Sequence, residues 1–169
     1  LQILVEQAEL RLSDKPGVLS EFWAAVGASN FQTGKYGLAE SYLSRAWRMR
    51  ERAPVSDLVP VYLAELERRR QDIGAAAEIL ESYFSEGGGE SVLSLAKLGS
   101  IYMQNNQWQE AAETFQKLTE RFPAAENSGE YLYYYAYSLY QLEKYREGDA
   151  VLDSVSESGG GGAYTSKLY

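Results

Sequence analysis

The sequence predicts an all-α fold built from antiparallel helix pairs, and three observations support this. Apolar residues recur at intervals of three and four along much of the chain, which is the spacing of one helical face. The pattern of one such segment occurs four times, at separations of 37, 35 and 37 residues. Short turns rich in polar residues, glycine or proline stand between the periodic segments, where one helix would end and the next begin. A pattern that stays in phase over four copies indicates a repeat.

The clearest helix pair is encoded by residues 95–123. Its first segment has an apolar face at i, i+3, i+4 and i+7, formed by Leu95, Leu98, Gly99 and Tyr102. Its second segment advances by three and four residues alternately, through Trp108, Ala111, Phe115, Leu118 and Phe122. The polar turn 105–107 separates the two segments. Pro123 ends the pair, because proline cannot continue a helix.

These residues resemble a tetratricopeptide repeat (TPR), a unit of about 34 residues with the pattern W-x2-L-G-x2-Y…A-x3-F…P. Leu95 stands in place of the tryptophan. The other positions of the pattern match at Leu98, Gly99, Tyr102, Ala111, Phe115 and Pro123. The resemblance implies a right-handed superhelical solenoid of about four pairs plus a partial repeat, whose concave face is lined by the first helix of each pair.

The same pattern divides residues 1–169 into the repeats of a single TPR-like domain. We expect full repeats at 20–54, 57–90, 92–126 and 129–158. Residues 1–16 fit the second helix of a partial repeat, and residues 159–169 fit the start of a further helix. An array cut in this way would expose apolar stacking faces at both ends, so we expect the chain to be a fragment of a longer protein.

The predicted core contains small residues where helices approach closely, and the repeat pattern is broken at three of its positions. We interpret Gly27, Ala64, Gly99 and Ala136 as positions where two helices approach closely. Asn30 and Glu67 occupy the place of Tyr102, where a polar side chain needs a partner or a rotated helix. Phe31 could compensate by turning into the core. Pro60 stands where the tryptophan is expected, so the second pair could be tilted or start late.

Composition excludes several kinds of chemistry. The chain has neither cysteine nor histidine, which excludes disulfides, thiol nucleophiles, imidazole bases and Cys/His zinc sites. A net charge of -8 would repel a phosphate backbone, so we expect no nucleic-acid partner. No apolar run approaches the roughly 20 residues of a membrane helix, so no direct membrane insertion is expected. We also expect no cofactor, no bound metal and no enzymatic activity.

Tyrosines are the most distinctive candidate for a binding surface, since six of them lie between Tyr131 and Tyr140. The core stripe of this segment is taken by Leu132, Tyr135, Ala136 and Leu139. The opposite face then carries Tyr133, Tyr137 and Tyr140 at i, i+4 and i+7, followed by Gln141. Tyrosine gives a large contact area at low entropic cost and is enriched at binding hot spots. Two interpretations remain open, because the row could contact a partner or pack on a neighbouring first helix.

The corresponding faces of the other pairs complete the predicted binding set. The third pair contributes Ser100, Met103 and Gln104, and the second contributes Val61, Glu65, Arg68 and Arg69. The first pair has Ala24, Ala28 and Phe31 there, so the carboxylate clamp found in some family members is not expected. The run 68–70 could attract a carboxylate-rich segment by bidentate contacts. It could equally serve the helix C-terminus, where cations relieve unpaired carbonyls.

The resemblance thus implies a non-catalytic scaffold that binds a partner peptide or protein on its concave face. Two other roles stay open, a structural array that self-associates into homo-oligomers through stacked repeats, and an adaptor domain of a larger multidomain protein. Residues 120–148 also resemble bacterial TPR proteins of the cell envelope, such as outer-membrane assembly and Tol–Pal accessory factors. That narrower resemblance implies the periplasm or cell envelope, while a cysteine-free chain is equally compatible with the cytoplasm.

Overall fold

A computed structural model of the chain describes residues 2–157. All regular elements within this range are helices, which confirms the all-α helical-repeat fold. None of these helices is both long and apolar enough to cross a membrane. The chain divides into two compact units, Leu1–Glu90 and Ser91–Tyr169. The further helix expected at 159–169 lies outside the described residues.

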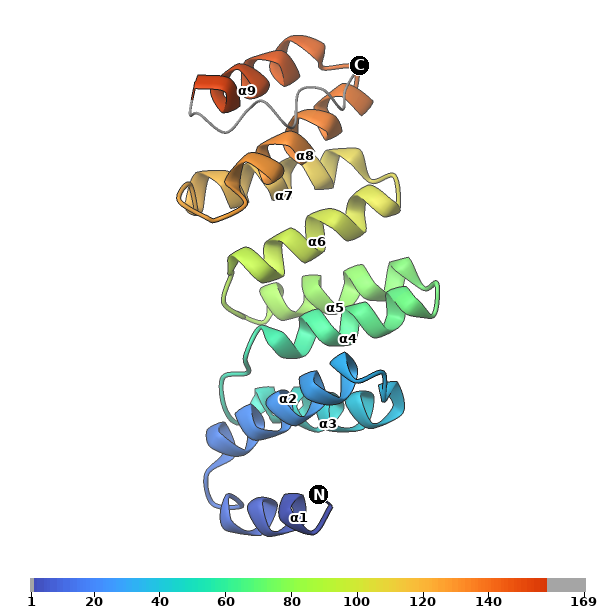
Figure 1. Cartoon of the computed structure of the whole chain (residues 1–169), viewed down its shortest axis with the longest axis vertical. Coiled ribbons are helices and arrows are strands. Elements are labelled where there is room, and N and C mark those ends of the chain that lie inside the picture. The colour runs from blue at the N-terminus through green and yellow to red at the C-terminus, as the bar shows by residue number, and fades with distance from the viewer. Residues whose placement is uncertain (1, 158–169) are drawn as a thin grey trace. The chain divides into compact units, whose positions relative to one another are not determined.

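The first unit is built from two helix hairpins and a preceding helix (Figure 1). Its elements are α1 (Gln2–Arg11), α2 (Pro16–Gln32), α3 (Tyr36–Arg48), the short 3-10 helix η1 (Met49–Glu51), α4 (Leu58–Arg69) and α5 (Ile73–Ser85). Helix α3 packs on both α2 and α4, so one core runs through the two hairpins. The buried residues of this core are Ala24, Ala39, Leu43, Ala46, Val59 and Leu66.

The second unit contains the next two hairpins (Figure 1). Its elements are α6 (Val92–Gln104), α7 (Trp108–Arg121), α8 (Ser128–Gln141) and α9 (Tyr145–Glu157). Helix α7 packs against both α6 and α8, and α8 packs in turn against α9. Phe115 and Leu118 of α7 are essentially inaccessible to solvent. They form the centre of this unit's core.

The turn inside each of the four hairpins has the same backbone conformation. Its left-handed residues are Gly34 (φ 75°), Gln71 (φ 67°), Asn106 (φ 56°) and Glu143 (φ 61°). The next N–H in each case donates to a carbonyl five residues earlier, from Lys35 to Asn30, Asp72 to Glu67, Gln107 to Tyr102 and Lys144 to Leu139. This is the Schellman motif, which satisfies the last carbonyls of a helix. The backbone therefore repeats with the separations of 37, 35 and 37 residues seen in the sequence.

The two polar departures from the repeat both have partners. The Asn30 side-chain amide donates to the Val26 carbonyl at 2.8 Å, within its own helix. The Glu67 carboxylate accepts from Arg70 at 2.6 Å. Phe31 does turn toward the core, where its ring centroid lies 5.3 Å from that of Tyr36. The expectation that these polar groups need a partner is confirmed.

Two glycines allow the helices of a pair to touch. A Cβ atom on Gly27 would lie 2.6 Å from Cγ of Leu43, and one on Gly99 would lie 2.7 Å from Cζ of Phe115. Both distances are far below van der Waals contact, so a side chain would force the helices apart. The predicted packing role of these two glycines is confirmed.

Three expectations for the first helices need correction. Ala24 and Val61 were expected opposite the core stripe, yet they are only 2% and 4% exposed. The prediction was wrong because α4 is covered by both α3 and α5, and α2 contacts both α3 and α4. A helix covered from two sides needs a broader apolar face than one stripe. Helix α4 also does not start late, since Pro60 lies in its first turn, where a missing N–H costs no helical hydrogen bond.

Candidate functional site

An aromatic surface lies where α8 crosses the start of α7, and it consists of Trp108, Tyr133 and Tyr137. The rings of Trp108 and Tyr137 meet edge to face, with centroids 5.8 Å apart and planes at 73°. The ring of Tyr133 lies 6.4 Å from that of Tyr137, at an angle of 27°. All three side chains are half-buried, so each keeps part of its surface accessible.

The aromatic surface is anchored in the core of the second unit. The ring of Tyr133 lies 5.8 Å from that of Tyr134, and Tyr134 lies 5.3 Å from Phe115. Phe115 is 1% exposed. The Tyr134 hydroxyl donates to the Glu130 carboxylate at 2.6 Å, which fixes the ring that joins the surface to the core. The half-buried ring of Tyr133 is therefore connected to the core through Tyr134.

Tyr140 has a different environment from the other two tyrosines of the predicted row. Its hydroxyl donates to the Asp149 carboxylate, and its ring centroid lies 5.8 Å from that of Tyr145. A Cβ atom on Gly148 would come within 2.8 Å of the Tyr140 ring. These contacts place Tyr140 in the packing of α8 on α9. Gln141 follows as the last residue of α8 and is exposed.

The predicted residues of α6 lie on its last two turns. Ser100 and Met103 are half-buried and Gln104 is exposed. The Ser100 hydroxyl donates to the Lys97 carbonyl at 2.8 Å, so it is engaged within its own helix. Met103 offers an adaptable apolar side chain and Gln104 an amide. Their part in partner binding stays a prediction.

Trp108 is the member of the aromatic surface that the sequence pattern did not identify. Its place at the head of the second-helix stripe predicted a core residue, but it is half-buried. It is the first residue of α7, directly after the turn that follows α6. A large aromatic side chain at the first position of a helix was the available signal.

Tyr135 belongs to the predicted core stripe of α8, and the pKa of its hydroxyl is raised above the ordinary value. Burial of the hydroxyl is the main cause, and the charges of Glu147 and Glu120 add to it. Tyr135 is half-buried rather than fully enclosed. Its hydroxyl stays protonated over the physiological range, so it acts as a neutral hydrogen-bonding group.

The three consecutive arginines at the end of α4 have different partners. Arg68 pairs with Glu65 one turn earlier, and this hydrogen bond raises the pKa of Arg68. Arg70 pairs with both Glu40 and Glu67, at 2.6 Å each. The Arg69 guanidinium lies 4.1 Å from the centroid of the Tyr36 ring. Glu65 and Arg68 therefore neutralise each other, and the run is not a uniform basic patch.

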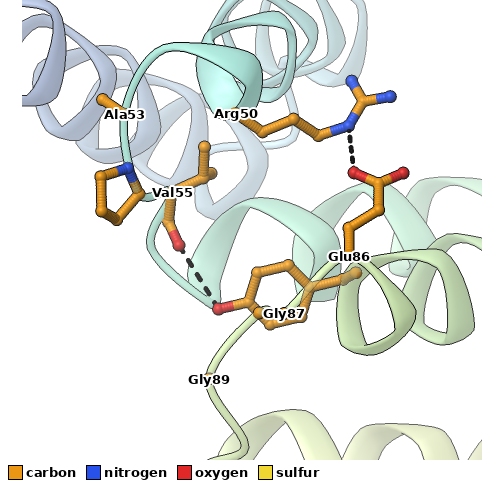
Figure 2. Close-up of a pocket in the computed structure, with 9 residues that line it drawn as sticks. Arg50, Ala53, Val55, Glu86, Gly87 and Gly89 are labelled. Atoms are coloured by element: carbon orange, nitrogen blue, oxygen red, sulfur yellow. Dashed lines mark hydrogen bonds and ion pairs between the residues drawn. The ribbon is translucent and has the colours of Figure 1, made fainter.

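A small pocket of about 130 Å³ lies beside the glycine run 87–89 (Figure 2). The Arg50 guanidinium donates to the Glu86 carboxylate at 2.7 Å across one side of it. The Tyr83 hydroxyl donates to the Val55 carbonyl at 3.3 Å across the other. Figure 2 marks both contacts with dashed lines. These two contacts join the end of α5 to η1 and to the segment that follows it. The Arg50 guanidinium is already paired with Glu86, so the pocket does not present an uncompensated positive charge to a ligand.

Acidic side chains offer little for metal chemistry in the described part of the chain. No three of them gather there into a set that could hold a metal ion.

Residues 94–125, which include most of α6 and all of α7, match the tetratricopeptide repeat family. Two crystal forms of MamA AMB-1 have a similar fold. The P212121 form has a TM-score of 0.63 and 17% identity over 82% of this chain and 72% of that chain. The C2221 form has a TM-score of 0.50 and 16% identity over 83% of this chain and 98% of that chain. The sequence has no significant match among curated proteins. Residues 94–125 therefore match one tetratricopeptide repeat, and the chain shares its helical fold with the two MamA structures.

Proposed function

We propose that the chain is a non-catalytic scaffold that binds a partner peptide or protein on the aromatic surface of its second unit. Helical-repeat proteins generally present extended surfaces to protein partners. The observation that carries the proposal is the run of ring contacts from Trp108 through Tyr137 to Tyr133. In the predicted solenoid Tyr133 and Tyr137 belong to the concave face, because α8 is the first helix of its pair, and Trp108 borders them from the start of α7.

The physical properties of the aromatic surface suit a binding hot spot. Each ring offers a large apolar area, and the tyrosine and tryptophan polar groups can donate hydrogen bonds to a peptide backbone. The rings are already held by their neighbours, so a partner would lose little free energy in ordering them. Binding energy at protein interfaces is concentrated in a few such anchored aromatic residues.

The other predicted binding residues of α6 and α8 would extend the contact. Met103 can adapt its shape to an apolar side chain of the partner, and Gln104 and Gln141 can bond to its backbone. We assign Ser100 and Tyr140 supporting positions at the edge. Ser100 already bonds within α6 and Tyr140 already bonds to α9. The expected interface is therefore an apolar centre with a polar rim.

Peptide selection tests this proposal with no assumption about the partner. A random peptide library displayed on phage would be selected on the immobilised protein, and the recovered peptides would be titrated against it. We expect the Tyr137→Ala variant to bind them at least about tenfold more weakly, because a hot-spot ring is lost. Tyr137→Phe, which keeps the ring, should retain most of the affinity.

Two results would count against the aromatic surface. Selected peptides that bind wild type and Tyr137→Ala equally well would place binding elsewhere. A mass in light scattering that rises with concentration and survives the Tyr137→Ala change would support the self-associating array instead.

A further inference from the structure

We propose that Arg69 and Tyr36 form a carboxylate-binding pocket in the first unit, and that its occupant is an acidic side chain of a partner peptide. This pocket is separate from the aromatic surface, which belongs to the second unit. The proposal therefore stands or falls independently of the function assigned to Tyr137.

The guanidinium of Arg69 is held in a way that leaves its donors available. It lies over the Tyr36 ring, with Cζ 4.1 Å from the centroid. A guanidinium has its five N–H donors in the plane of the group, and a cation–π contact with a ring does not by itself require those donors. Among the described residues, Arg69 forms no ion pair with a carboxylate. An anchored guanidinium with open donors is suited to a bidentate contact with a carboxylate.

The space beside this guanidinium can admit a side chain. A pocket of about 360 Å³ is lined by Tyr36, Gly37, Glu40, Leu66, Arg69 and Arg70. Apart from its chain neighbours and the backbone of its own helix, nothing lies within 4 Å of the position that a Cβ atom on Gly37 would take, so the glycine leaves its side of the pocket open. Leu66 is buried and the Tyr36 ring is half-buried, which gives the pocket apolar walls. An aliphatic stem that ends in a carboxylate fits this combination.

The acidic group in the pocket does not compete for Arg69. The Glu40 carboxylate is held by Arg70 at 2.6 Å, and Arg70 is bonded to Glu67 as well. These two carboxylates raise the pKa of Arg70. Arg70 therefore stays charged, and the two carboxylates compensate its charge. The lining residues Glu40, Arg69 and Arg70 sum to one positive charge, and Glu67, bonded to Arg70, brings the local sum to zero. An acidic side chain would therefore be held by the open N–H donors of Arg69 rather than by an excess of positive charge.

An acidic peptide serves as the probe. A short, end-blocked, fluorescent peptide of alternating glutamate and serine would be titrated by anisotropy at low ionic strength. Its matched control replaces each glutamate with glutamine, which keeps the shape and removes the charge. Arg69→Gln should weaken binding of the acidic peptide about tenfold, the value of a charge-assisted hydrogen bond. Arg52→Gln removes an equal charge from an exposed site elsewhere in the first unit and should change affinity by less than about twofold.

A second variant tests the pocket itself without altering any charge. Gly37→Leu would place a side chain in the open space beside Arg69, and it should abolish binding of the acidic peptide. Tyr137→Ala should leave that binding unchanged. Equal losses in Arg69→Gln and Arg52→Gln would show general charge attraction and overturn the proposal. Unchanged binding in Gly37→Leu, or equal binding of the glutamine peptide to wild type, would overturn it as well.

Discussion

Trp108 and Tyr137 meet edge to face with their ring centroids 5.8 Å apart, and this contact joins the third helix pair to the fourth. It lies outside the fully buried core, whose aromatic centre is Phe115 at 1% exposed. Half-buried rings at a contact between two helices stabilise the fold, and part of their apolar surface stays accessible to a partner. The candidate site is thus part of the packing of α8 on α7, which fixes its geometry before a partner arrives.

The contact between Trp108 and Tyr137 should be measurable as a coupling energy. We expect a double-mutant cycle with Trp108→Ala and Tyr137→Ala to give about 0.5–1.5 kcal/mol, the usual value of an aromatic pair beyond its buried area. Urea denaturation of the four proteins provides the free energies of unfolding. Additive losses, with no coupling, would contradict the contact.

Gly99 should not tolerate even one methyl group. Gly99→Ala would place Cβ 2.7 Å from the Phe115 ring, and we expect it to reduce the free energy of unfolding by about 1–3 kcal/mol. Gly37→Ala is the matched control, because its Cβ atom meets nothing and alanine favours a helix by up to about 1 kcal/mol. Thermal denaturation should therefore shift down for Gly99→Ala and up for Gly37→Ala. An unchanged or raised midpoint for Gly99→Ala would refute the close approach.

The left-handed turn residues offer a stabilising change. Gln71 has a φ of 67°, a conformation that costs a residue with a side chain about 1 kcal/mol and suits glycine. Gln71→Gly should raise the free energy of unfolding by about 0.5–1 kcal/mol. Gly34→Ala, at the equivalent turn with a φ of 75°, should lower it by about 1 kcal/mol. Chemical denaturation would reveal the error if the two changes acted in the same direction.

The ion pair between Arg50 and Glu86 predicts a loss of stability in acid. Hydrogen bonds from Arg50 and Ser82 lower the pKa of Glu86, so the folded chain releases this proton more readily than the unfolded chain. The resulting stabilisation is present above the unfolded pKa and is lost as pH falls through the folded pKa. Wild type should therefore exceed Glu86→Gln in stability at neutral pH, and the difference should vanish in acid. Urea titrations at several pH values check this, and a difference that grew on acidification would have the wrong sign.

Local pattern was enough to predict the helix pairs and their turns. The spacing of Leu98, Gly99 and Tyr102 predicted a helix, and Gly99 does lie against Phe115 as a close approach requires. The three-and-four spacing from Trp108 onward predicted α7. Both inferences depend only on residues close in sequence, where helical geometry fixes which side chains share a face.

Features that depend on packing between helices escaped the sequence pattern. Spacing placed Tyr133, Tyr137 and Tyr140 on one face. Gly148 of α9, however, leaves room for the Tyr140 ring, and the Tyr140 hydroxyl bonds to Asp149. The cation–π contact of Arg69 with Tyr36 joins two helix pairs. Residue spacing within one helix carries no information about such a contact.

The affinity of a selected peptide for two tyrosine variants tests the central claim most directly. Tyr137 belongs to the aromatic surface, whereas Tyr145 is 55% exposed on α9 and serves as the matched control. The account predicts that Tyr137→Ala weakens binding at least about tenfold while Tyr145→Ala changes it by less than about twofold. Equal affinities for the two variants, or a greater loss with Tyr145→Ala, would contradict it.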